Sequence, residues 1–568
     1  MEIQYSDGHK IEKKIYNLVK NSPSFSSLDY IYSSPCEWAV EYHLSPCRAN
    51  LLRPFHFKNL EVLDLGAGMG AVSHYLAEEC AHLTIVEGTH SRFSVIKQRL
   101  RQFHHWEGHV GNLFEISLAK KFDVVCLIGV LEYAELFISS PTPFLSLLEK
   151  AKSYLKEDGV LILAIENKLG LKYWLGCKED HLQKPFVGIC DYPPSPTPKT
   201  FSRKELIHLL NQTGFEHTKL YYPFPDYKVV KCVISSDLAR LSPELCSNLS
   251  TQSYFQNYGS VTIASFPEIL AQESLTRAGL FEDFSNSFLV LGTRQPNSST
   301  LSHITRRESK GELGWHYSNN RKISTQTSFI REASSDSLRV SKTSILTPPI
   351  QEQIFTGKDI SIKWKQLPPH AVQNHLPLRT QMAKDAYFKT RRNLLTPFLS
   401  WVFSQYETDK FHLSGEALDA VFTNAVIKED GSFDLFDIEW ELLSPFPKTW
   451  CLLRNLIALS GPNQKVYGAI LRGKNLKTTY HKMCREVSLT PEYETDLNQE
   501  AALQALMTRV SDQRDIYLSL KRGMEDKILR TPYPNERLSL KERIPFLVKE
   551  RLKSYPHLYH FLKEIRTS

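Results

Sequence analysis

A strand, a glycine-rich turn and a helix follow one another in the segment EVLDLGAGMGAVSHYLAEE, residues 61–79. The short segment Glu61–Leu65, with Val62, Leu63 and Leu65, predicts a buried strand that leads directly into the turn. Gly66 and Gly68 allow a tight turn and let a ligand approach the backbone, while the start of the following helix presents unpaired N–H groups. This unit is typical of an α/β fold with a mainly parallel sheet, and it constrains the first half of the chain more than any other feature.

Short apolar strands continue to alternate with amphipathic stretches up to about Ser235. Further strands are expected at Leu83–Glu87, Asp123–Ile128 and Val160–Ile165. A long aromatic and proline-rich insertion, residues 167–199, then precedes a helix that starts near Ser202. Such a length is unusual inside a compact domain, and the insertion would lie beyond the carboxyl end of a strand, where these sheets bind ligands. We therefore expect the insertion to be functional.

The glycine spacing alone also satisfies the dinucleotide-binding pattern, so it does not identify the ligand. Two carboxylates narrow the choice of ligand. Asp64 lies two residues before Gly66, where a dinucleotide-binding strand normally stays apolar. A carboxylate there suits a cationic or amino-bearing ligand such as S-adenosylmethionine. Glu87 ends the next strand, where an acid accepts hydrogen bonds from both ribose hydroxyls. The alternative for Glu87 is an exposed acid at a strand end.

The segments EVLDLGAGMG, TIVEG, GNLFE, FDVVCLIGVLEY and LKEDGVLILAIEN resemble successive motifs of the class I S-adenosylmethionine-dependent methyltransferases. They occur in the family's order and at its usual spacing, over roughly residues 35–235. The resemblance implies a Rossmann-like α/β domain and an enzyme that uses S-adenosylmethionine as its methyl donor. Many members have Asp at the position of Asn112, but an amide oxygen can also accept from the adenine amino group.

The resemblance also implies which residues bind the cofactor. They are Asp64, Gly66, Gly68 and Gly70 for the methionine moiety, Glu87 for the ribose, Asn112 and Leu113 for the adenine, and Gly129. Gly129 and Glu132 follow the fourth strand, as the family's active-site edge does.

The flanking segments HLSPCRANLLRPF, AIENKLGLKYWLGCKEDH, TFSRKEL and YYPFPDYK are similar to methyltransferases of bacterial surface-polysaccharide and glycan clusters. This similarity implies a bacterial protein that acts on a glycan or glycan-linked acceptor. The aromatic, amide and carboxylate groups of the insertion suit a sugar. Equally, Tyr173 and Trp174 can serve only to pack the insertion against the domain.

The acceptor decides which further groups are needed. A neutral hydroxyl requires a base, and His181 is the candidate, oriented by Glu179 or Asp180. The alternative for His181 is a hydrogen-bonded loop histidine without a catalytic role. A phosphate acceptor is already anionic and would need cations instead. The candidate cations are Arg48, Lys168 and Lys172.

In the second half, GEALDAVFTNAVIKEDGSFDLFDIEW contains three polar residues at the intervals of a protein-kinase catalytic loop. The resemblance implies that Asp419 receives a hydroxyl proton and that Asn424 and Asp437 hold magnesium. Lys342, in the segment RVSK, would bind the phosphates of ATP. Together with the first half, this resembles fused methyltransferase-kinases that terminate bacterial polysaccharide chains.

The chain also departs from the kinase pattern. Ala417-Leu418 replaces His-Arg, the Asp-Phe-Gly motif is Asp437-Ile438-Glu439, and no glycine-rich loop precedes Lys342. The turn 318–320 would have to cover the phosphates. The alternative is that Asp437, Glu439 and Trp440 simply end an edge strand.

Six segments are expected along the chain. They are an N-terminal helical, substrate-side segment (1–58), a class I methyltransferase domain (59–235), a mostly helical extension (236–295), a polar linker (296–312), a kinase-like α+β domain (313–490) and a helical, basic tail (491–568). Within the α+β domain, β structure is expected at 315–346, helix at 371–405, and a hairpin at Asp430-Gly431.

Composition limits the partners and the compartment. The 69 basic and 62 acidic residues give a diffuse charge of +7, which does not indicate a nucleic-acid partner. Ten cysteines without zinc-like spacing indicate a reducing compartment. Because the sequence lacks a signal peptide and an apolar run near 18 residues, a cytoplasmic protein is expected.

The segment 541–568 carries seven Lys or Arg against three Glu, interleaved with aromatic residues. Such a segment can bind a partner protein or the inner face of a membrane. The alternative is that it packs on its own domain.

Three functions therefore stay open. The first is a glycan methyltransferase with an appended kinase-like domain. The second is a small-molecule or protein methyltransferase whose second half is a non-catalytic binding module. The third is a scaffold without catalysis, against which the intact Asp64, the three glycines and Glu87 argue.

Overall fold

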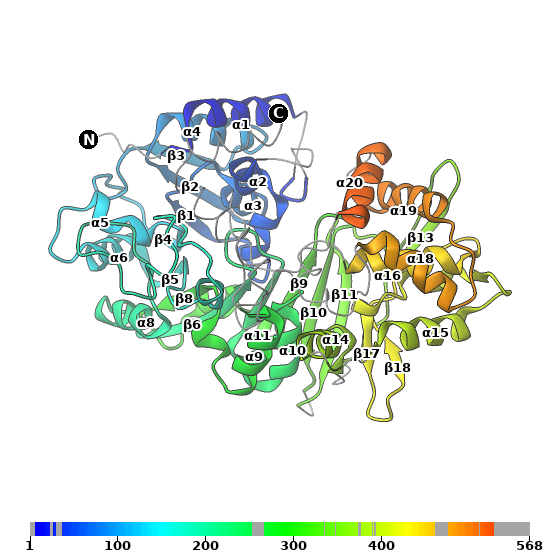
Figure 1. The fold of residues 1–568 in the computed structure, drawn as a ribbon. Coiled ribbons are helices and arrows are strands. Elements are labelled where there is room, and N and C mark those ends of the chain that lie inside the picture. The colour runs from blue at the N-terminus through cyan, green and yellow to red at the C-terminus, as the bar shows by residue number, and fades with distance from the viewer. Residues whose placement is uncertain are drawn as a thin grey trace, which may run out of the picture.

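The computed structural model describes residues 6–22, 26–29, 37–252, 266–333, 336–346, 348–372, 376–388, 390, 393–459, 475–509 and 512–526. Within them, one sheet of twelve strands runs through the molecule in the order β14-β11-β10-β9-β7-β6-β8-β5-β4-β1-β2-β3. Helices α16 (Lys448–Ala458), α18 (Leu476–Glu486), α19 (Tyr493–Met507) and α20 (Gln513–Glu525) gather beyond β11, at the opposite end from α4 (His90–Arg99) and α6 (Pro143–Ser153) (Figure 1).

The parallel part of this sheet has the order β3-β2-β1-β4-β5. Its strands are β1 (Glu61–Leu65), β2 (His82–Glu87), β3 (Trp106–Val110), β4 (Phe122–Ile128) and β5 (Leu155–Glu166), connected in part by α3 (Ala71–Glu79), α4 (His90–Arg99) and α6 (Pro143–Ser153). The central strands are apolar on both faces because both faces are covered. The four strands predicted from the sequence are confirmed, and α8 (Arg203–Gln212) begins after a capping box at Ser202.

Antiparallel strands extend the sheet. They are β6 (His217–Phe224), β7 (Cys232–Ser235), β8 (Ser287–Thr293), β9 (Glu312–Ser318), β10 (Thr325–Arg331), β11 (Leu338–Ser344) and β14 (His370–Ala371). The expected extension 236–295 does contain helices α9 (Ser236–Leu241), α10 (Pro243–Ser250), α11 (Glu268–Arg277) and α12 (Phe281–Phe284), but it ends in β8. Because β8 is fully buried between β5 and β6, this extension completes the first sheet and is not an appendage.

The expected linker 296–312 is also structured, as α13 (Ser299–Ile304) followed by a short 3-10 helix. Its Ser and Thr residues serve helix capping: the Ser298 side chain accepts from Leu301 N, and the Asp158 carboxylate accepts from Ser299 N and Thr300 N. Since β9 then pairs with β7, the boundary placed at 312 falls inside a continuous sheet.

The second half surrounds a core that contains Trp364, Trp440 and Trp450. Its small sheets comprise β12 (Glu352–Thr356), β13 (Ser361–Lys365), β15 (Leu376–Pro377), β16 (His412–Leu413), β17 (Ala425–Ile427), β18 (Phe433–Leu435), β19 (Trp440–Leu442) and β20 (Phe446–Pro447). Its helices are α14 (Leu378–Tyr387), α15 (Leu395–Tyr406), α16 (Lys448–Ala458), α18 (Leu476–Glu486), α19 (Tyr493–Met507) and α20 (Gln513–Glu525). The hairpin predicted at Asp430-Gly431 is confirmed as β17–β18.

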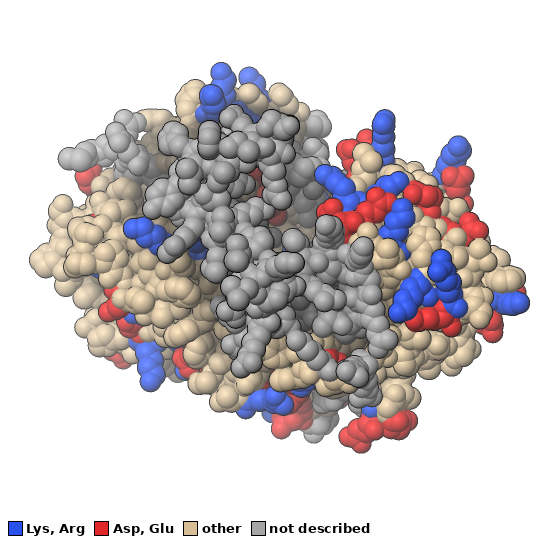
Figure 2. All heavy atoms as spheres, in the orientation of Figure 1, with Lys and Arg blue, Asp and Glu red and all other residues tan. Residues whose placement is uncertain are grey.

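The helical tail expected from 491 does not begin there. Leu497 and Leu503 of α19 are buried in the second core, and Glu500 accepts a hydrogen bond from Trp450 Nε1 at 2.9 Å. Residues 527–568, with the basic segment, lie outside the described residues. Over the helices of the second half, acidic and basic side chains are interspersed on the face in Figure 2.

The N-terminal helical segment consists of α1 (His9–Asn21), α2 (Trp38–Leu44) and a 3-10 helix (Pro46–Leu51). Ile15 and Leu44 pack against Met69 and Val95, so this segment covers the edge of the sheet where the glycine turn lies. Of the helices in the described ranges, none combines the length and the apolar character needed to cross a bilayer.

Candidate active site

A cavity opens at the carboxyl ends of β1, β2 and β4, and it encloses about 1110 Å³ including its part open to solvent. Seven residues expected at the cofactor line it, from separate segments: Asp64, Gly66, Gly68, Glu87, Asn112, Leu113 and Gly129. Tyr42, His43 and Arg48 of the N-terminal segment form a further wall, of which the sequence had indicated only Arg48.

The glycine turn leaves open space above the backbone. Gly66 and Gly68 have left-handed φ angles of 79° and 58°, and a Cβ on Gly68 would meet no heavy atom within 4 Å. Gly70 is different, because it does not line the cavity but caps α3 and faces Ile96. The structure therefore does not place Gly70 at the cavity where the methionine moiety was expected, and its positive φ serves the start of the helix.

Both predicted carboxylates are buried in the cavity wall. Asp64 accepts a hydrogen bond from Ser73 Oγ at 2.6 Å, and burial raises its pKa to about 6. Glu87 is 5% exposed and accepts from Gly68 N at 2.9 Å and Thr89 N at 3.1 Å. Burial also raises the pKa of Glu87. The alternative of an exposed strand-end acid is thus wrong, since Glu87 holds the glycine turn.

The insertion 167–199 does not orient His181 as expected. Glu179 Oε2 accepts from His181 N at 2.9 Å and Leu182 N at 2.7 Å, while Asp180 Oδ2 contacts the ammonium groups of Lys172 and Lys228. These two acids therefore bind the backbone and the lysines, respectively. Their closeness to His181 in sequence does not bring their carboxylates to its ring.

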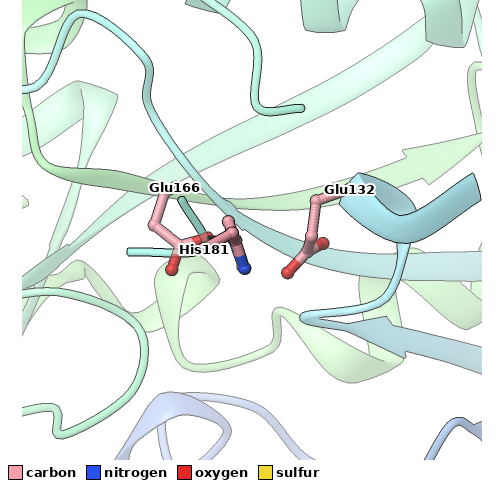
Figure 3. A group of neighbouring side chains, drawn as sticks. All are labelled: Glu132, Glu166 and His181. Carbon is pink, nitrogen blue, oxygen red and sulfur yellow. Dashed lines mark ion pairs between the residues drawn. The ribbon is translucent and has the colours of Figure 1, made fainter. Parts of the chain in front are cut away.

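His181 instead faces Glu132 and Glu166, and we call these three residues the Glu–Glu–His cluster. Their side chains point toward one another from the 3-10 helix after β4, the end of β5 and the insertion (Figure 3). One ligand atom of each lies within 4.8 Å of the others. Tyr133 connects the cluster to the cavity, because it lines the cavity and its hydroxyl lies 3.0 Å from His181 Nδ1.

The cluster is strongly charged. Burial works to lower the pKa of His181, but Glu166 and the other carboxylates outweigh it and raise this pKa to about 9. Burial and the nearby Glu166 raise the pKa of Glu132 to about 7. At neutral pH the His181 imidazole therefore carries a proton, which does not suit the general base expected from the sequence. Glu166 was missed, although an acid that ends an apolar strand is the same signal that identified Glu87.

Among the three cations expected for a phosphate acceptor, only Arg48 lines the cavity. Its guanidinium donates to Lys228 O at 2.9 Å and lies over the Tyr42 ring. Lys168 pairs with Asp191 and Glu205, and Lys172 with Asp180. Tyr173 is 2% exposed, as the packing alternative for this residue predicts.

A second cavity lies between β9–β11 and the β17–β18 region, and Lys342 and Asp437 both line it. Lys342 Nζ lies 2.7 Å from Asp437 Oδ1 and 3.0 Å from Glu439 Oε2. Asp437 has a left-handed φ of 62°. The structure thus brings together two kinase-like residues that are 95 positions apart.

The other kinase-like residues do not reach this cavity. Asp419 Oδ2 accepts from Glu439 N and Trp440 N, at 3.0 and 2.8 Å, and Asn424 Nδ2 donates to Asp419 O. The turn 318–320 does not cover the cavity either, because Asn319 is buried and accepts from Asn50 Nδ2. The structure therefore does not support the expected roles of Asp419 as proton acceptor, of Asn424 as magnesium ligand and of the turn 318–320 as a cover for the phosphates.

Residues 40–220 match a family model described as a methyltransferase domain. The ubiquinone biosynthesis O-methyltransferase of Haemophilus ducreyi is 30% identical over 143 residues, which cover 22% of this chain and 58% of that protein. The chain therefore spans less than two thirds of this relative. The first part of the chain contains a methyltransferase domain.

Two solved structures match this chain at lower identity. The N-methyltransferase NodS of Bradyrhizobium japonicum, in complex with S-adenosylhomocysteine, is 18% identical, with 29% of this chain and 76% of that one covered and a TM-score of 0.21. A possible histamine N-methyltransferase of Thermotoga maritima is 14% identical, with 50% and 96% covered and a TM-score of 0.26.

Proposed function

We propose that this protein is a methyltransferase that uses S-adenosylmethionine as its donor. One observation carries the proposal: a single cavity collects Asp64, the glycine turn, Glu87, Asn112 and Gly129 from the ends of successive strands. The open space above Gly68 and the buried carboxylate on each side of it fit a nucleoside with a charged tail. When bound, S-adenosylmethionine supplies a methyl group on a cationic sulfur.

The residues of the cavity would then hold and orient the cofactor. Glu87 would accept from the ribose hydroxyls, and its bonds to Gly68 N and Thr89 N keep the carboxylate in place before binding. Asp64 would face the amino-bearing end of the cofactor. Methyl transfer depends mainly on the alignment of donor and acceptor. Such positioning can lower the activation barrier by roughly several kcal/mol.

For the acceptor we propose a hydroxyl group of a glycan or a glycan-linked molecule. Two of the three candidate cations for a phosphate are held in ion pairs away from the cavity. The acceptor side of the cavity is instead aromatic, with Tyr42, Tyr133 and Phe137 in its wall, and flat rings suit a sugar face. A small-molecule hydroxyl is the alternative that the same wall accommodates.

Calorimetry with S-adenosylmethionine tests the proposal, followed by incubation with the labelled donor and a panel of sugars, sugar phosphates and small phenols. We expect one bound cofactor per chain, and a product heavier by one methyl group from a sugar hydroxyl. Absence of cofactor binding by the folded chain would overturn the methyltransferase. Transfer to phenols alone would overturn the glycan acceptor.

Cofactor affinity should depend on pH through Asp64. Its pKa is raised to about 6, so below that pH the carboxyl is neutral and loses its attraction for a cation. We expect the dissociation constant to rise roughly tenfold for each pH unit below 6 and to be flat above it. Titration calorimetry between pH 4.5 and 8 measures this. Asp64→Asn should bind weakly without this pH dependence; a wild-type profile in Asp64→Asn would contradict the assignment.

A second candidate function, nucleotide binding, concerns the other cavity. The contact of Lys342 with Asp437 and the mostly apolar wall around them favour it, because a base can pack there while the lysine meets phosphate. We propose binding without phosphoryl transfer, since Asp419 is occupied by the backbone of Glu439 and Trp440.

Asp437→Ala is expected to weaken magnesium-dependent ATP binding by at least about tenfold, as one charged ligand is lost. Equilibrium binding of a fluorescent ATP analogue, with and without magnesium, gives the measurement. Asp430 lies in the exposed turn of the hairpin β17–β18, which precedes Asp437. Asp430→Ala is therefore the matched control and should bind ATP as the wild type does. Equal ATP binding by the two variants would remove Asp437 from the site.

A further inference from the structure

Three ligand atoms of the Glu–Glu–His cluster converge without hydrogen-bond partners in the described part of the chain. They are Glu132 Oε2, Glu166 Oε2 and His181 Nε2. The two glutamates are 0% exposed and the histidine side chain 8%. His181 Nε2 lies 3.8 Å from Glu166 Oε2, which is beyond hydrogen-bonding distance.

The opposite atom of each side chain is held by another residue. Tyr227 donates to Glu132 Oε1 at 3.4 Å, Lys228 contacts Glu166 Oε1, and the Tyr133 hydroxyl lies 3.0 Å from His181 Nδ1. These contacts fix the orientation of all three ligands, as the outer partners of metal ligands do. Buried polar atoms are almost always partnered, so three orphans that face one point indicate a missing ligand.

The charges around the cluster indicate that this ligand is a cation. The ion-paired network contains the ammonium groups of Lys172 and Lys228 and the carboxylates of Glu166, Asp180 and Asp226. Glu132 adds a fourth carboxylate. With His181 neutral, as a metal ligand must be, four acids against two lysines leave two negative charges, which a divalent cation that displaces the histidine proton would balance.

We propose that Glu132, Glu166 and His181 bind one divalent transition-metal ion. One imidazole nitrogen with two carboxylate oxygens suits Mn²⁺, Fe²⁺, Co²⁺ or Zn²⁺, since the imidazole makes magnesium and calcium less suitable. Two atoms that each lie about 2.1 Å from one ion are at most about 4.2 Å apart, so the present separations of up to 4.8 Å require only a slight closure. With Nε2 on the metal, Nδ1–H would donate to Tyr133.

The ion deepens the proposed function and rests on it for its role. It would join the insertion to the ends of β4 and β5, next to Tyr133 in the cavity wall. Three protein ligands leave positions for other oxygens, as in metal sites that bind a substrate. The ion would therefore hold the oxygen of a hydroxyl acceptor near the donor and lower the pKa of that hydroxyl, so that its proton can leave to solvent through the open side of the cavity as the oxygen takes the methyl group. Acceptors with two neighbouring hydroxyls should bind best.

The full chain, treated with a chelator and then titrated with Mn²⁺, Co²⁺ or Zn²⁺ alone, tests the site by calorimetry and, for Co²⁺, by its visible absorption. We expect one ion per chain, and a melting temperature that rises on binding. Glu132→Gln should weaken binding at least about 100-fold. Glu135→Gln is the matched control: Glu135 lies three residues further on and pairs with Lys199, so its loss should leave metal affinity unchanged.

Two outcomes would overturn the site: no stoichiometric ion in the folded wild type, or wild-type affinity in Glu132→Gln. If Glu132→Gln does not fold, His181→Asn gives the same test from the insertion side. Binding of S-adenosylmethionine by the metal-free chain is measured in parallel. Metal binding without cofactor binding would refute the methyltransferase alone, and cofactor binding without metal binding would refute only the ion.

Discussion

Replacement of Glu87 by alanine is expected to raise the dissociation constant for S-adenosylmethionine at least about 100-fold. Two hydrogen bonds from ribose hydroxyls to a carboxylate are each worth about 1.5–3 kcal/mol, and 1.4 kcal/mol corresponds to a factor of ten. The variant also frees Gly68 N and Thr89 N, which the carboxylate now holds. The turn that faces the cofactor therefore loses its restraint as well.

Isothermal calorimetry at pH 7.5 measures this change, with circular dichroism to establish that the variant is folded. Glu107→Ala provides the control, because Glu107 lies on the neighbouring strand β3 and contacts Thr84 without lining the cavity. Its affinity should equal that of the wild type. Unchanged affinity in Glu87→Ala would mean that the ribose lies elsewhere, and the placement of the cofactor would have to be abandoned.

Gly415→Ala is expected to cause the largest loss of stability in the second half. An added Cβ would lie 1.7 Å from the carbonyl oxygen of Leu442, which belongs to strand β19 and cannot move as a flexible side chain can. The helix Gly415–Asp419 is bound to the same strand, since Asp419 accepts from Glu439 N and Trp440 N. Relief of the overlap would pull these contacts apart.

The expected loss for Gly415→Ala is at least about 3 kcal/mol, as for severe overpacking. Denaturant unfolding, followed by tryptophan fluorescence, measures it. Gly431→Ala is the matched control, with a φ of 82° but no heavy atom within 4 Å of the added Cβ. It should cost only about 1–2 kcal/mol, the strain of a left-handed residue. A smaller effect for Gly415→Ala than for Gly431→Ala would contradict the contact with Leu442.

Local patterns predicted much of the first domain. The strand Glu61–Leu65 has the expected bounds, the helix after Ser202 starts at its capping box, and Glu87 lies in the cavity wall. These features depend on residues close in sequence, where apolar runs, glycines and caps determine the backbone. The hairpin at Asp430-Gly431 was predictable for the same reason.

Gly70 and the segment 296–312 show where local patterns mislead. A glycine at a helix start can either contact a ligand or cap the helix. A serine in a polar stretch can either belong to a linker or cap a helix. The packing of Ile96 against Gly70 and the bonds of Asp158 to α13 decide between them. Both partners are distant in sequence, so no local signal identifies them.

The sequence by itself determined the strand–turn–helix unit and the two acids of the cofactor cavity, because each follows from residues within one strand and its turn. Only the tertiary structure decided the acceptor side. Glu132, Glu166 and His181 meet because the strand ends and the insertion converge at one edge, with Lys228 and Tyr133 holding their other atoms. That convergence arises from chain crossovers and from burial of charge, and neither leaves a pattern in neighbouring residues.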